Sequence, residues 1–438
     1  MKNVKKKIAV IGGGAAGMMA AVWASDKDTL VEIYERNDRV GKKLLATGNG
    51  KCNFSNANMG SDAYYGSAVS FYDKLYSEFG MMQTVDFFSQ SGMLIKNRDG
   101  YLYPASEQAS TVLDVLRIEL ERRGVRIHTG NKVEKIEKDD KNGKFRVITA
   151  GGKAGGEMGF AKEIDKEAWY DAVILACGGK AAPSTGSDGL GIKIAESLGH
   201  HAVPMVPALV QLRCREDFFK SIAGVRTQAK LTLNIDGGAV CSIKGELQLT
   251  DYGISGIPVF CFSREASYAL LHKKKVTVDI DFLPQFGEGA DDASEEYGSF
   301  FKERWIRRAD LSLEQFLTGI ANKKINQLII RLAGCKPHET AASVSEDKRA
   351  VLEGLYRKLT VSVYAANGFE HAQVSAGGIP AKELTYELES KLVSGLYFAG
   401  EIIDIDGICG GYNLQWAWTS GVTAGRAAAR NVKAAEAV

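Results

Sequence analysis

The chain has 438 residues, 45% hydrophobic and 25% charged, the balance of an ordinary globular protein with room for two or three domains. Its formal net charge of +2 gives no basis for attraction to nucleic acid or to an acidic membrane, and no apolar run is long enough to cross a bilayer. The seven cysteines are scattered without a CxxC pair, and the six histidines lack metal-ligand spacing. We therefore predict a cytoplasmic protein with neither a disulfide framework nor a metal site.

The N-terminal region combines two apolar runs with a glycine motif. Ile8–Ile11 has the length of a buried strand, and a GxGxxG motif, an Ala-rich helix and a second strand follow it. Gly12 allows a tight turn, Gly14 lets backbone approach a pyrophosphate, and Gly17 lets the helix pack closely on the sheet. Glu35 stands where a carboxylate accepts hydrogen bonds from a ribose diol. This order predicts a dinucleotide-binding βαβ unit, and a βαβ unit without a ligand is the alternative.

The segment from Arg36 to Asn56 is rich in glycine, lysine and small polar residues, and its pattern is not that of a regular element. We predict an extended loop that returns beneath the bound dinucleotide. Lys42 or Lys43 would meet a phosphate, and the amides of Thr47–Asn53 would meet a flavin-like ring. A solvated surface loop is the alternative.

The next predicted elements are a helix over Tyr72–Gln90, a short loop over Arg98–Pro104 and an amphipathic helix over Ala109–Arg123. Three alternating segments between residues 125 and 150 then predict a small antiparallel meander, because turn signals separate them. Gly151–Gly156 would form its flexible tip.

Tyr170–Ala176 has the pattern of a second buried strand and ends at Cys177-Gly178-Gly179. Thr185–Gly191 follows and opens a helix that runs through Ser197. This second glycine-rich helix start would either face the cofactor or serve as a domain hinge, and the sequence leaves both interpretations open.

The pattern changes after residue 196, which we take as the end of the N-terminal part of the first domain. Short strands predict a β-rich inserted domain over 197–283, completed by about 345–370, and helical patterns predict an inserted subdomain over 284–344. In the helical part, Ser312 and Gln315 are spaced as a capping box. Residues 371–438 return to the first domain.

The C-terminal part contains a strand that ends in Gly400 and Glu401, a glycine loop and a helix from Asn413 onward. If the ligand is FAD, Glu401 can hold a ribityl hydroxyl, and the helix N-terminus can point its positive dipole end at the ring. Gly421 and Gly425 predict close packing of this helix on the sheet. A helix that only covers the sheet is the alternative. The chain has a single GxGxxG, so NADH or NADPH, if used, would bind transiently without a domain of its own.

These segments together resemble a bacterial and archaeal flavoprotein family labelled NAD(FAD)-utilising dehydrogenases. The resemblance implies an α/β fold, with a Rossmann-like FAD-binding domain built from both chain ends and with inserted β-rich and helical subdomains. It rests on GGGAAG at 12–17, ER at 35–36, GKKLLATGNGKCNFSN at 41–56, ACGGKAAPSTGSDGLG at 176–191, DYGISGIPVF at 251–260, SAGGI at 375–379 and GLYFAGEIIDIDGICGGYNLQWAWTSG at 395–421.

The resemblance also implies a set of FAD contacts. The glycine motif would serve the pyrophosphate, the acid after the second strand the ribose, a meander strand the adenine, and the last helix start the flavin ring. The residues so assigned are Gly12, Gly14, Ala15, Ala16, Gly17, Glu35, Arg36, Lys43, Leu44, Thr47, Gly48, Asn49, Cys52, Asn53, Val133, Ala176, Cys177, Gly178, Gly400, Glu401, Gly411, Tyr412, Asn413 and Leu414.

Members of this family are linked to reduction of a steroid ring double bond in bile-acid metabolism and to oxidation of a small amino ketone. The leading hypothesis is an FAD-dependent, NAD(P)H-linked oxidoreductase that reduces a small enone-like substrate by hydride transfer through flavin N5. Tyr412 and Cys409 are candidate proton donors. The alternatives are an oxidase of a small amine or amino ketone that uses oxygen, and a non-catalytic FAD-binding redox or RNA-associated module. We expect a small-molecule substrate, with no nucleic-acid or membrane partner.

Overall fold

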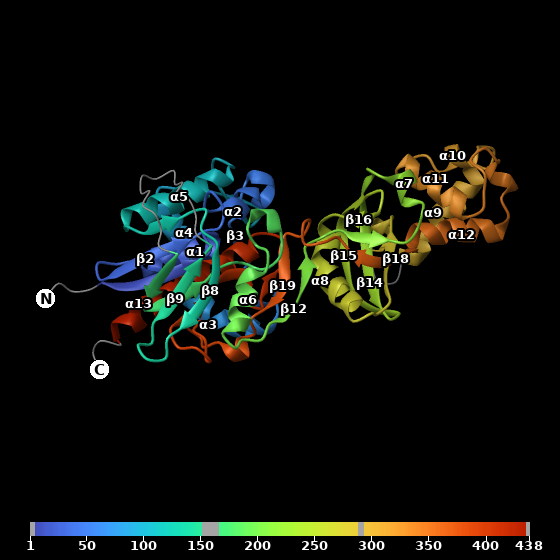
Figure 1. The fold of residues 1–438 in the computed structure, drawn as a ribbon. Helices are drawn as coiled ribbons and strands as arrows, with labels where there is room; N and C mark the ends of the chain where they lie inside the picture. The colour runs from blue at the N-terminus through green and yellow to red at the C-terminus, as the bar shows by residue number, and fades with distance from the viewer. Residues whose placement is uncertain (1–4, 151–165, 288–292, 435–438) are drawn as a thin grey trace. The chain divides into compact units, whose positions relative to one another are not determined.

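The computed structural model describes residues 5–150, 166–287 and 293–434 (Figure 1). The chain divides into two compact units, the first made of residues 1–206 and 373–438 and the second of residues 207–372. The polypeptide therefore leaves the first unit once and returns to it once. The first segment of this unit ends at residue 206, ten residues after the position 196 that we expected from the sequence. The difference arises because α6 (Leu190–Ser197) still lies in the first unit and β12 (Val203–Ala208) begins there.

A five-stranded parallel sheet forms the centre of the first unit, and its presence confirms the predicted Rossmann-like fold. Apolar runs form its strands because both faces of such a sheet are covered. Residues 8–11 of β1 and residues 172–175 of β11 are all buried. The strands lie in the order β20 (Leu396–Phe398), β11 (Ala172–Leu175), β1 (Lys6–Ile11), β2 (Thr29–Tyr34) and β7 (Arg126–His128).

Helices α1 (Ala15–Ala24) and α13 (Tyr412–Ala434) pack against one another, although they come from opposite ends of the chain (Figure 1). A Cβ atom on Gly421 would lie 2.6 Å from the Ala16 carbonyl oxygen, and one on Gly425 would overlap the Ala20 carbonyl oxygen. The two glycines thus permit close packing, but the partner is α1 rather than the sheet that the sequence suggested.

The predicted meander is partly wrong. Its first strand, β7, pairs in parallel with β2 and extends the main sheet. The antiparallel sheet instead contains β8 (Val133–Lys138), β9 (Phe145–Thr149) and β10 (Glu167–Tyr170). The three residues of β7 carry no local signal of the strand with which they pair. The sequence therefore could not show that this strand joins the parallel sheet. The predicted tip at Gly151–Gly156 lies outside the described residues.

Three local predictions in the first unit also need correction. The loop after Glu35 contains a short helix, α2 (Lys42–Ala46). The helix expected over residues 72–90 is two helices, α3 (Tyr72–Glu78) and α4 (Met81–Gln90), because Gly80 is extended there and its N–H donates to Gln83 Oε1 at 3.0 Å. The expected loop at 98–104 is a hairpin. It contains β5 (Ile95–Arg98) and β6 (Tyr101–Pro104), which pairs with β3 (Ser55–Asn56), and α5 (Ala109–Arg122) follows.

The second unit is built on a closed barrel with the strand order β13-β16-β15-β14-β17-β18. Helix α8 (Ile257–Leu271), which packs against the barrel strands, was not predicted from the sequence. Pro258 occupies its first helical turn, where proline is tolerated. The barrel strands are Leu212–Cys214, Gly253–Ser255, Gly238–Leu249, Arg226–Ile235, Val276–Asp281 and Leu359–Ala366.

The helical part of the second unit shares the barrel's core and is not a separate body. Phe301 and Leu328 from the helices belong to the same buried cluster as Val278 from β17. The predicted capping box at Ser312 and Gln315 is confirmed at the start of α10. The helices are α7 (Phe219–Ile222), α9 (Ala293–Arg307), α10 (Leu313–Phe316), α11 (Lys323–Leu332) and α12 (Glu346–Arg357), of which the first and the last were not predicted.

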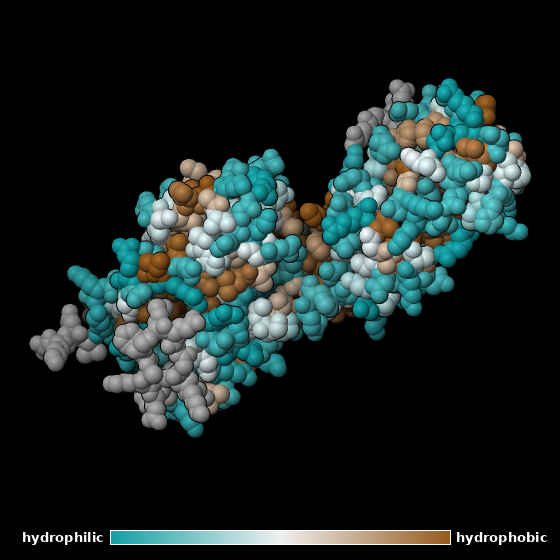
Figure 2. All heavy atoms as spheres, turned by 90° about the horizontal axis from the view of Figure 1, so that it is seen from above, coloured by the Kyte–Doolittle hydropathy of each residue, from teal (hydrophilic) through white to brown (hydrophobic). Residues whose placement is uncertain are grey.

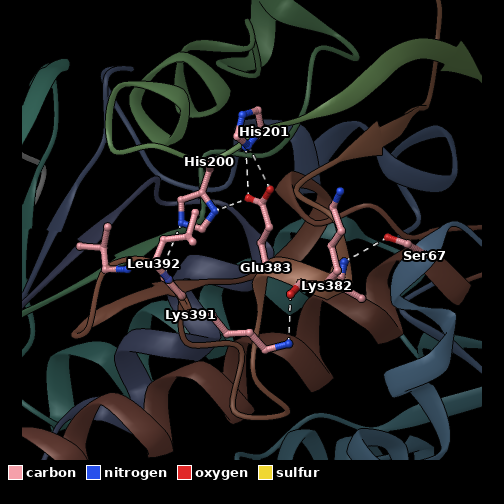
Figure 3. Close-up of polar contacts among 10 residues, drawn as sticks. Ser67, His200, His201, Lys382, Glu383, Lys391 and Leu392 are labelled. Carbon is pink, nitrogen blue, oxygen red and sulfur yellow. Dashed lines mark hydrogen bonds and ion pairs between the residues drawn. The ribbon is translucent and has the colours of Figure 1, made fainter.

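A buried polar cluster in the first unit ties the outgoing segment to the returning one (Figure 3). Strand β12 pairs with β19 (Val374–Gly378), and Glu383 lies between two neighbouring histidines. His200 Nδ1 is 2.7 Å from Glu383 Oε2, and its Nε2 is 2.8 Å from Ser390 Oγ. The His201 N–H also donates to Glu383 Oε2, at 3.1 Å. Burial lowers the pKa of His200, although Glu383 opposes the shift.

Hydrophilic side chains cover most of the face seen in Figure 2, and the hydrophobic ones among them are scattered. Large exposed apolar side chains such as Leu94, Ile257 and Ile306 come from different elements. Across the described ranges no helix is long and apolar enough to pass through a membrane, including the 23-residue α13.

Candidate functional site

A cavity with about 1280 Å³ of empty space, its solvent-open mouth included, lies in the first unit. Ile11, Tyr34, Ala176 and Ala399 line it, and each stands at or just after the carboxyl end of a strand of the parallel sheet. Ligands of open α/β sheets bind outside these strand ends, where the loops diverge. The cavity therefore occupies the place at which this class of fold binds a nucleotide.

The glycine motif forms one wall of the cavity. Gly12 has a φ of +108°, and a Cβ atom there would lie 2.5 Å from the Ala176 carbonyl oxygen. A Cβ atom on Gly17 would overlap the Gly12 carbonyl oxygen, so this glycine serves helix packing and does not line the cavity. Gly14 lines the cavity and has no heavy atom near its Cβ position. Backbone is thus exposed to a ligand where the sequence motif predicted a pyrophosphate.

No side chain of the described residues caps the N-terminus of α1. Gly14 is its N-cap, and Ala15 and Ala16 also line the cavity. The first amides of a helix carry partial positive charge and bind phosphate oxygens when no side chain satisfies them. The start of α1 therefore fits a pyrophosphate group.

The Glu35 carboxylate is fixed at the cavity wall by backbone amides. Its Oε2 accepts the Gly13 N–H at 2.9 Å, and its Oε1 accepts the Asn37 N–H at 2.8 Å. Oε1 also accepts the Asn37 Nδ2–H at 2.8 Å, so it is Oε2 that keeps a further lone pair, because a carboxylate accepts about four hydrogen bonds. The side chain is buried and lines the cavity, so its position suits the hydroxyls of a ribose.

The second glycine-rich helix start also reaches the cavity. Thr185, Gly186 and Asp188 line it together with Cys177 and Gly178. Asp188 forms an ion pair with Arg36 across the cavity wall. The structure therefore favours the cofactor-facing interpretation of this segment over that of a hinge.

A lysine and a glutamate from distant parts of the chain meet at the cavity. Lys43 Nζ on α2 is 2.6 Å from Glu401 Oε2, and Glu401 Oε1 accepts the Ser375 N–H at 2.8 Å. The two side chains are 26% and 19% exposed. Leu44, Thr47, Val133, Gly400, Asn413 and Leu414, each predicted from the sequence, line the same cavity.

Part of the predicted flavin loop does not line the cavity. Gly48, Asn49, Cys52 and Asn53 are not among the lining residues, and burial raises the pKa of the Cys52 thiol to about 12. The Asn53 Oδ1 atom is buried and has no hydrogen-bond partner among the described residues, and a Cβ atom on Gly411 would lie 3.0 Å from it. This buried acceptor lies beside the start of α13 and outside the cavity lining.

The two candidate proton donors are not placed in the lining of the cavity. The Tyr412 hydroxyl is buried and donates to the Asn58 carbonyl oxygen at 3.0 Å. Burial raises the pKa values of both Tyr412 and Cys409, so both groups are held in their neutral forms. Their surroundings are those of structural groups.

Several lining residues were missed by sequence reasoning. Gln373 and Val374 directly precede the SAGGI motif, and Asn131 donates its N–H to the Glu35 carbonyl oxygen at 2.9 Å. Others are Gly13, Lys132, Ile194, Ala399, Ile405, Trp416 and Ala417. In the described ranges no group of His, Cys, Asp and Glu is arranged to hold a metal ion.

The sheet, the glycine turn, the uncapped helix start and the fixed acid define a Rossmann-type dinucleotide-binding protein. Residues 6–427 match the family described as HI0933-like protein Rossmann domain, and the chain belongs to this family. Its cofactor is FAD, and the protein is an FAD-dependent oxidoreductase.

Named relatives span the same length of chain. The sequence is 41% identical over 430 residues to the 3-dehydro-bile acid delta(4,6)-reductase of Clostridium scindens, covering 97% of this chain and 99% of the relative. It is 26% identical over 423 residues to the ribosomal RNA dihydrouridine synthase of Haemophilus influenzae, covering 94% and 95%. Among solved structures, the 3-ketosteroid-delta4-(5alpha)-dehydrogenase of Rhodococcus jostii RHA1 gives a TM-score of 0.45 at 16% identity, covering 97% of both chains.

Proposed function

We propose that this protein is an NAD(P)H-dependent reductase of a carbon–carbon double bond conjugated to a carbonyl group, in a small acid of the bile-acid type. The observation that carries the proposal is the 41% identity to a delta(4,6)-reductase of a 3-dehydro-bile acid, which extends over 97% of this chain. The overall reaction adds one hydride equivalent and one proton across the double bond, and NAD(P)H becomes NAD(P)⁺.

The names of both relatives describe one chemical outcome. A 3-dehydro acid with delta(4,6) double bonds has those bonds conjugated to the C3 ketone. Dihydrouridine is uridine in which the C5–C6 double bond, conjugated to the C4 carbonyl, has been saturated. Both named products thus follow from hydride addition to the β-carbon of an unsaturated carbonyl compound. This shared outcome supports the reduction of an electron-poor double bond over the oxidation of an amine.

FAD, when bound, supplies two-electron hydride chemistry. The chain's own residues bind and orient it: the α1 amides at the phosphates, Glu35 at the ribose, and Lys43 with Glu401 at the opposite wall. Apolar side chains such as Ile405 and Leu414 line the same cavity and exclude water from it. With a single dinucleotide motif in the chain, NADH or NADPH would bind transiently.

The test uses the purified FAD-loaded protein under nitrogen. NADH and NADPH are added in turn, and loss of the flavin absorbance band is followed; a 3-oxo-4-ene bile acid is then added, with the saturated 3-oxo acid as the matched control. We expect bleaching by one nucleotide, and recovery of the band together with a saturated product only with the enone. Recovery with air but not with the enone would support an oxidase and contradict this proposal.

A second candidate substrate is a uracil base in RNA, since the ribosomal RNA dihydrouridine synthases of Haemophilus influenzae and Escherichia coli are each 26% identical to this chain. The same reduced protein, mixed with unmodified ribosomal RNA, would then form dihydrouridine, detected by mass spectrometry of nucleosides. RNA left unmodified while the bile acid is reduced would exclude this candidate.

A further inference from the structure

The loop between β7 and β8 lies at the cofactor cavity of the first unit. It follows the carboxyl end of a strand of the parallel sheet, the edge at which this class of fold binds its ligand. Asn131, Lys132 and Val133, where the loop passes into β8, all line the cavity. The Asn131 backbone N–H donates to the Glu35 carbonyl oxygen at 2.9 Å, so this segment is joined to the residue that suits the ribose.

The Asn131 side chain is held in one orientation. The residue is 1% exposed, and its Nδ2 donates to the Thr129 carbonyl oxygen at 2.8 Å. A carbonyl oxygen can only accept, so the amide atom that faces it is the nitrogen. The other amide atom, Oδ1, is buried and has no hydrogen-bond partner among the described residues.

A buried acceptor without a donor is unfavourable, because it has lost its hydrogen bonds to water and gained none in return. Such atoms occur at several places in the described ranges, but Asn131 is the one residue among those described that both carries such an atom and lines the cavity. A donor on the bound cofactor would therefore satisfy Oδ1.

The chemistry of FAD limits which donor this can be. The adenine base has one donor group, the amino group on C6, since its ring nitrogens N1, N3 and N7 are acceptors. The ribose hydroxyls have their own acceptor in Glu35, whose Oε2 keeps a lone pair beside its bond from Gly13. Along the dinucleotide the base follows the ribose on the side away from the phosphates, and Asn131 is bonded to Glu35. The adenine amino group is thus the donor that matches Oδ1.

We propose that Asn131 Oδ1 accepts a hydrogen bond from the adenine amino group of FAD and thereby makes the cavity select adenine over other bases. A base with a carbonyl oxygen at this position, such as hypoxanthine, would place a second acceptor against Oδ1 and leave both atoms unpaired. Sites built on a hydrogen bond reject an analogue that lacks the donor strongly, because a buried polar group then stays unsatisfied. The inference concerns the cofactor alone and does not depend on the identity of the substrate.

The test is a competition between FAD and two analogues that differ from it only in the base. Hypoxanthine replaces adenine in one analogue, and purine without the amino group replaces it in the other. The full-length FAD-loaded protein is incubated with equal concentrations of FAD and one analogue until the bound fractions stop changing. Chromatography of the dinucleotides released from the separated protein then gives the ratio of the two dissociation constants. This readout needs neither substrate nor turnover.

We expect the wild-type protein to prefer FAD about 10- to 100-fold over both analogues. Asn131→Ala removes the acceptor, so the preference should fall to about threefold or less. A general loss of affinity in this variant cancels in the ratio, because FAD and the analogues share every other group. Asn131→Leu, which fills the space that alanine leaves, should give the same reduced preference.

Thr149→Val is the matched control. Thr149 Oγ1 is likewise buried and has no hydrogen-bond partner among the described residues, but Thr149 does not line the cavity. It pairs with Val133 between β9 and β8, so the change is made on the neighbouring strand. We expect this variant to keep the wild-type preference for FAD, and a preference reduced as far as in Asn131→Ala would overturn the inference.

Two other results would overturn it. A wild-type protein that binds FAD and the purine analogue with dissociation constants within about twofold of one another does not bind the amino group. An Asn131→Ala protein that keeps the wild-type preference binds the amino group through a different residue. The amount of dinucleotide bound per chain shows whether each variant has folded. A protein that reduces no enone would refute the proposed function and leave the outcome of this competition unchanged.

Discussion

The crossing of α1 and α13 gives a prediction whose sign comes from the structure alone. We expect Gly421→Ala to destabilise the first unit, because the new Cβ atom would lie 2.6 Å from the Ala16 carbonyl oxygen and 3.1 Å from Met19 Cβ. The atom in the way is backbone, which cannot rotate aside as a flexible side chain would. The two helices must therefore separate by several tenths of an ångström.

The magnitude combines two opposing terms. Overpacking of a well-packed interior costs about 1–3 kcal/mol, and contact with backbone places this case at the upper end. Replacing an interior helical glycine by alanine returns about 1 kcal/mol of helix propensity. The net loss in the free energy of unfolding is then about 2 kcal/mol. Because Ala16 also lines the cavity, the same change should weaken FAD retention.

Gly354→Ala in α12 is the matched control. It is the same substitution within a helix, but no heavy atom lies within 4 Å of the Cβ position. Only the propensity term remains, so we expect this variant to be more stable than wild type by about 0.5–1 kcal/mol. Urea unfolding, followed by far-UV circular dichroism and by release of FAD, measures both. A Gly421→Ala protein at least as stable as wild type would refute the packing argument.

Three further predictions concern the cavity and the cluster of Figure 3. Lys43→Met leaves Glu401 without its cation, and we expect the Kd for FAD to rise about tenfold in a fluorescence titration, whereas an unchanged Kd would contradict the role of this pair. Tyr412→Phe removes only a hydrogen bond to backbone, so the rate at which the enone reoxidises the reduced flavin in stopped flow should stay within about twofold; a hundredfold loss would restore Tyr412 as a proton donor. The free energy of unfolding should fall on acidification, first as pH drops below about 6.5 and again below about 4.5. Burial lowers the pKa of His200 from its usual 6.5. For Glu383, burial alone would raise the pKa, but hydrogen bonds from His201 and His200 lower it from its usual 4.5. The unfolded chain therefore binds more protons in both windows, and the stability lost is that which the neutral imidazole and the ionised carboxylate contribute. A His200→Asn variant should show a flatter dependence near pH 6, and an unaltered slope there would contradict this assignment.

The parts of the fold that the sequence predicted well are those with strong local signals. The strand, glycine turn and helix from Ile8 onward need only the contacts of neighbouring residues, and the capping box at Ser312 is likewise local. FAD as the cofactor followed from the same glycines together with Glu35 and the C-terminal motif.

The parts that sequence analysis missed depend on contacts between distant residues or on signals with two meanings. Pro258 and its neighbouring glycines indicate a turn equally well as a helix start. The place of β7 in the parallel sheet depends on β2, about ninety residues earlier. Arg213 meets Asn367 across 154 residues, so no pattern near either one reveals the pair.

The most direct test of the central claim is the anaerobic absorbance spectrum of the FAD-loaded protein as NADH, NADPH and then a 3-oxo-4-ene bile acid are added. The account predicts that one nucleotide bleaches the flavin band and that the enone restores it with formation of the saturated acid, while the saturated control does not. A band that neither nucleotide bleaches, or that the enone leaves bleached, would contradict the proposed reductase. A protein that takes up no FAD at all would contradict the assignment of the cavity itself.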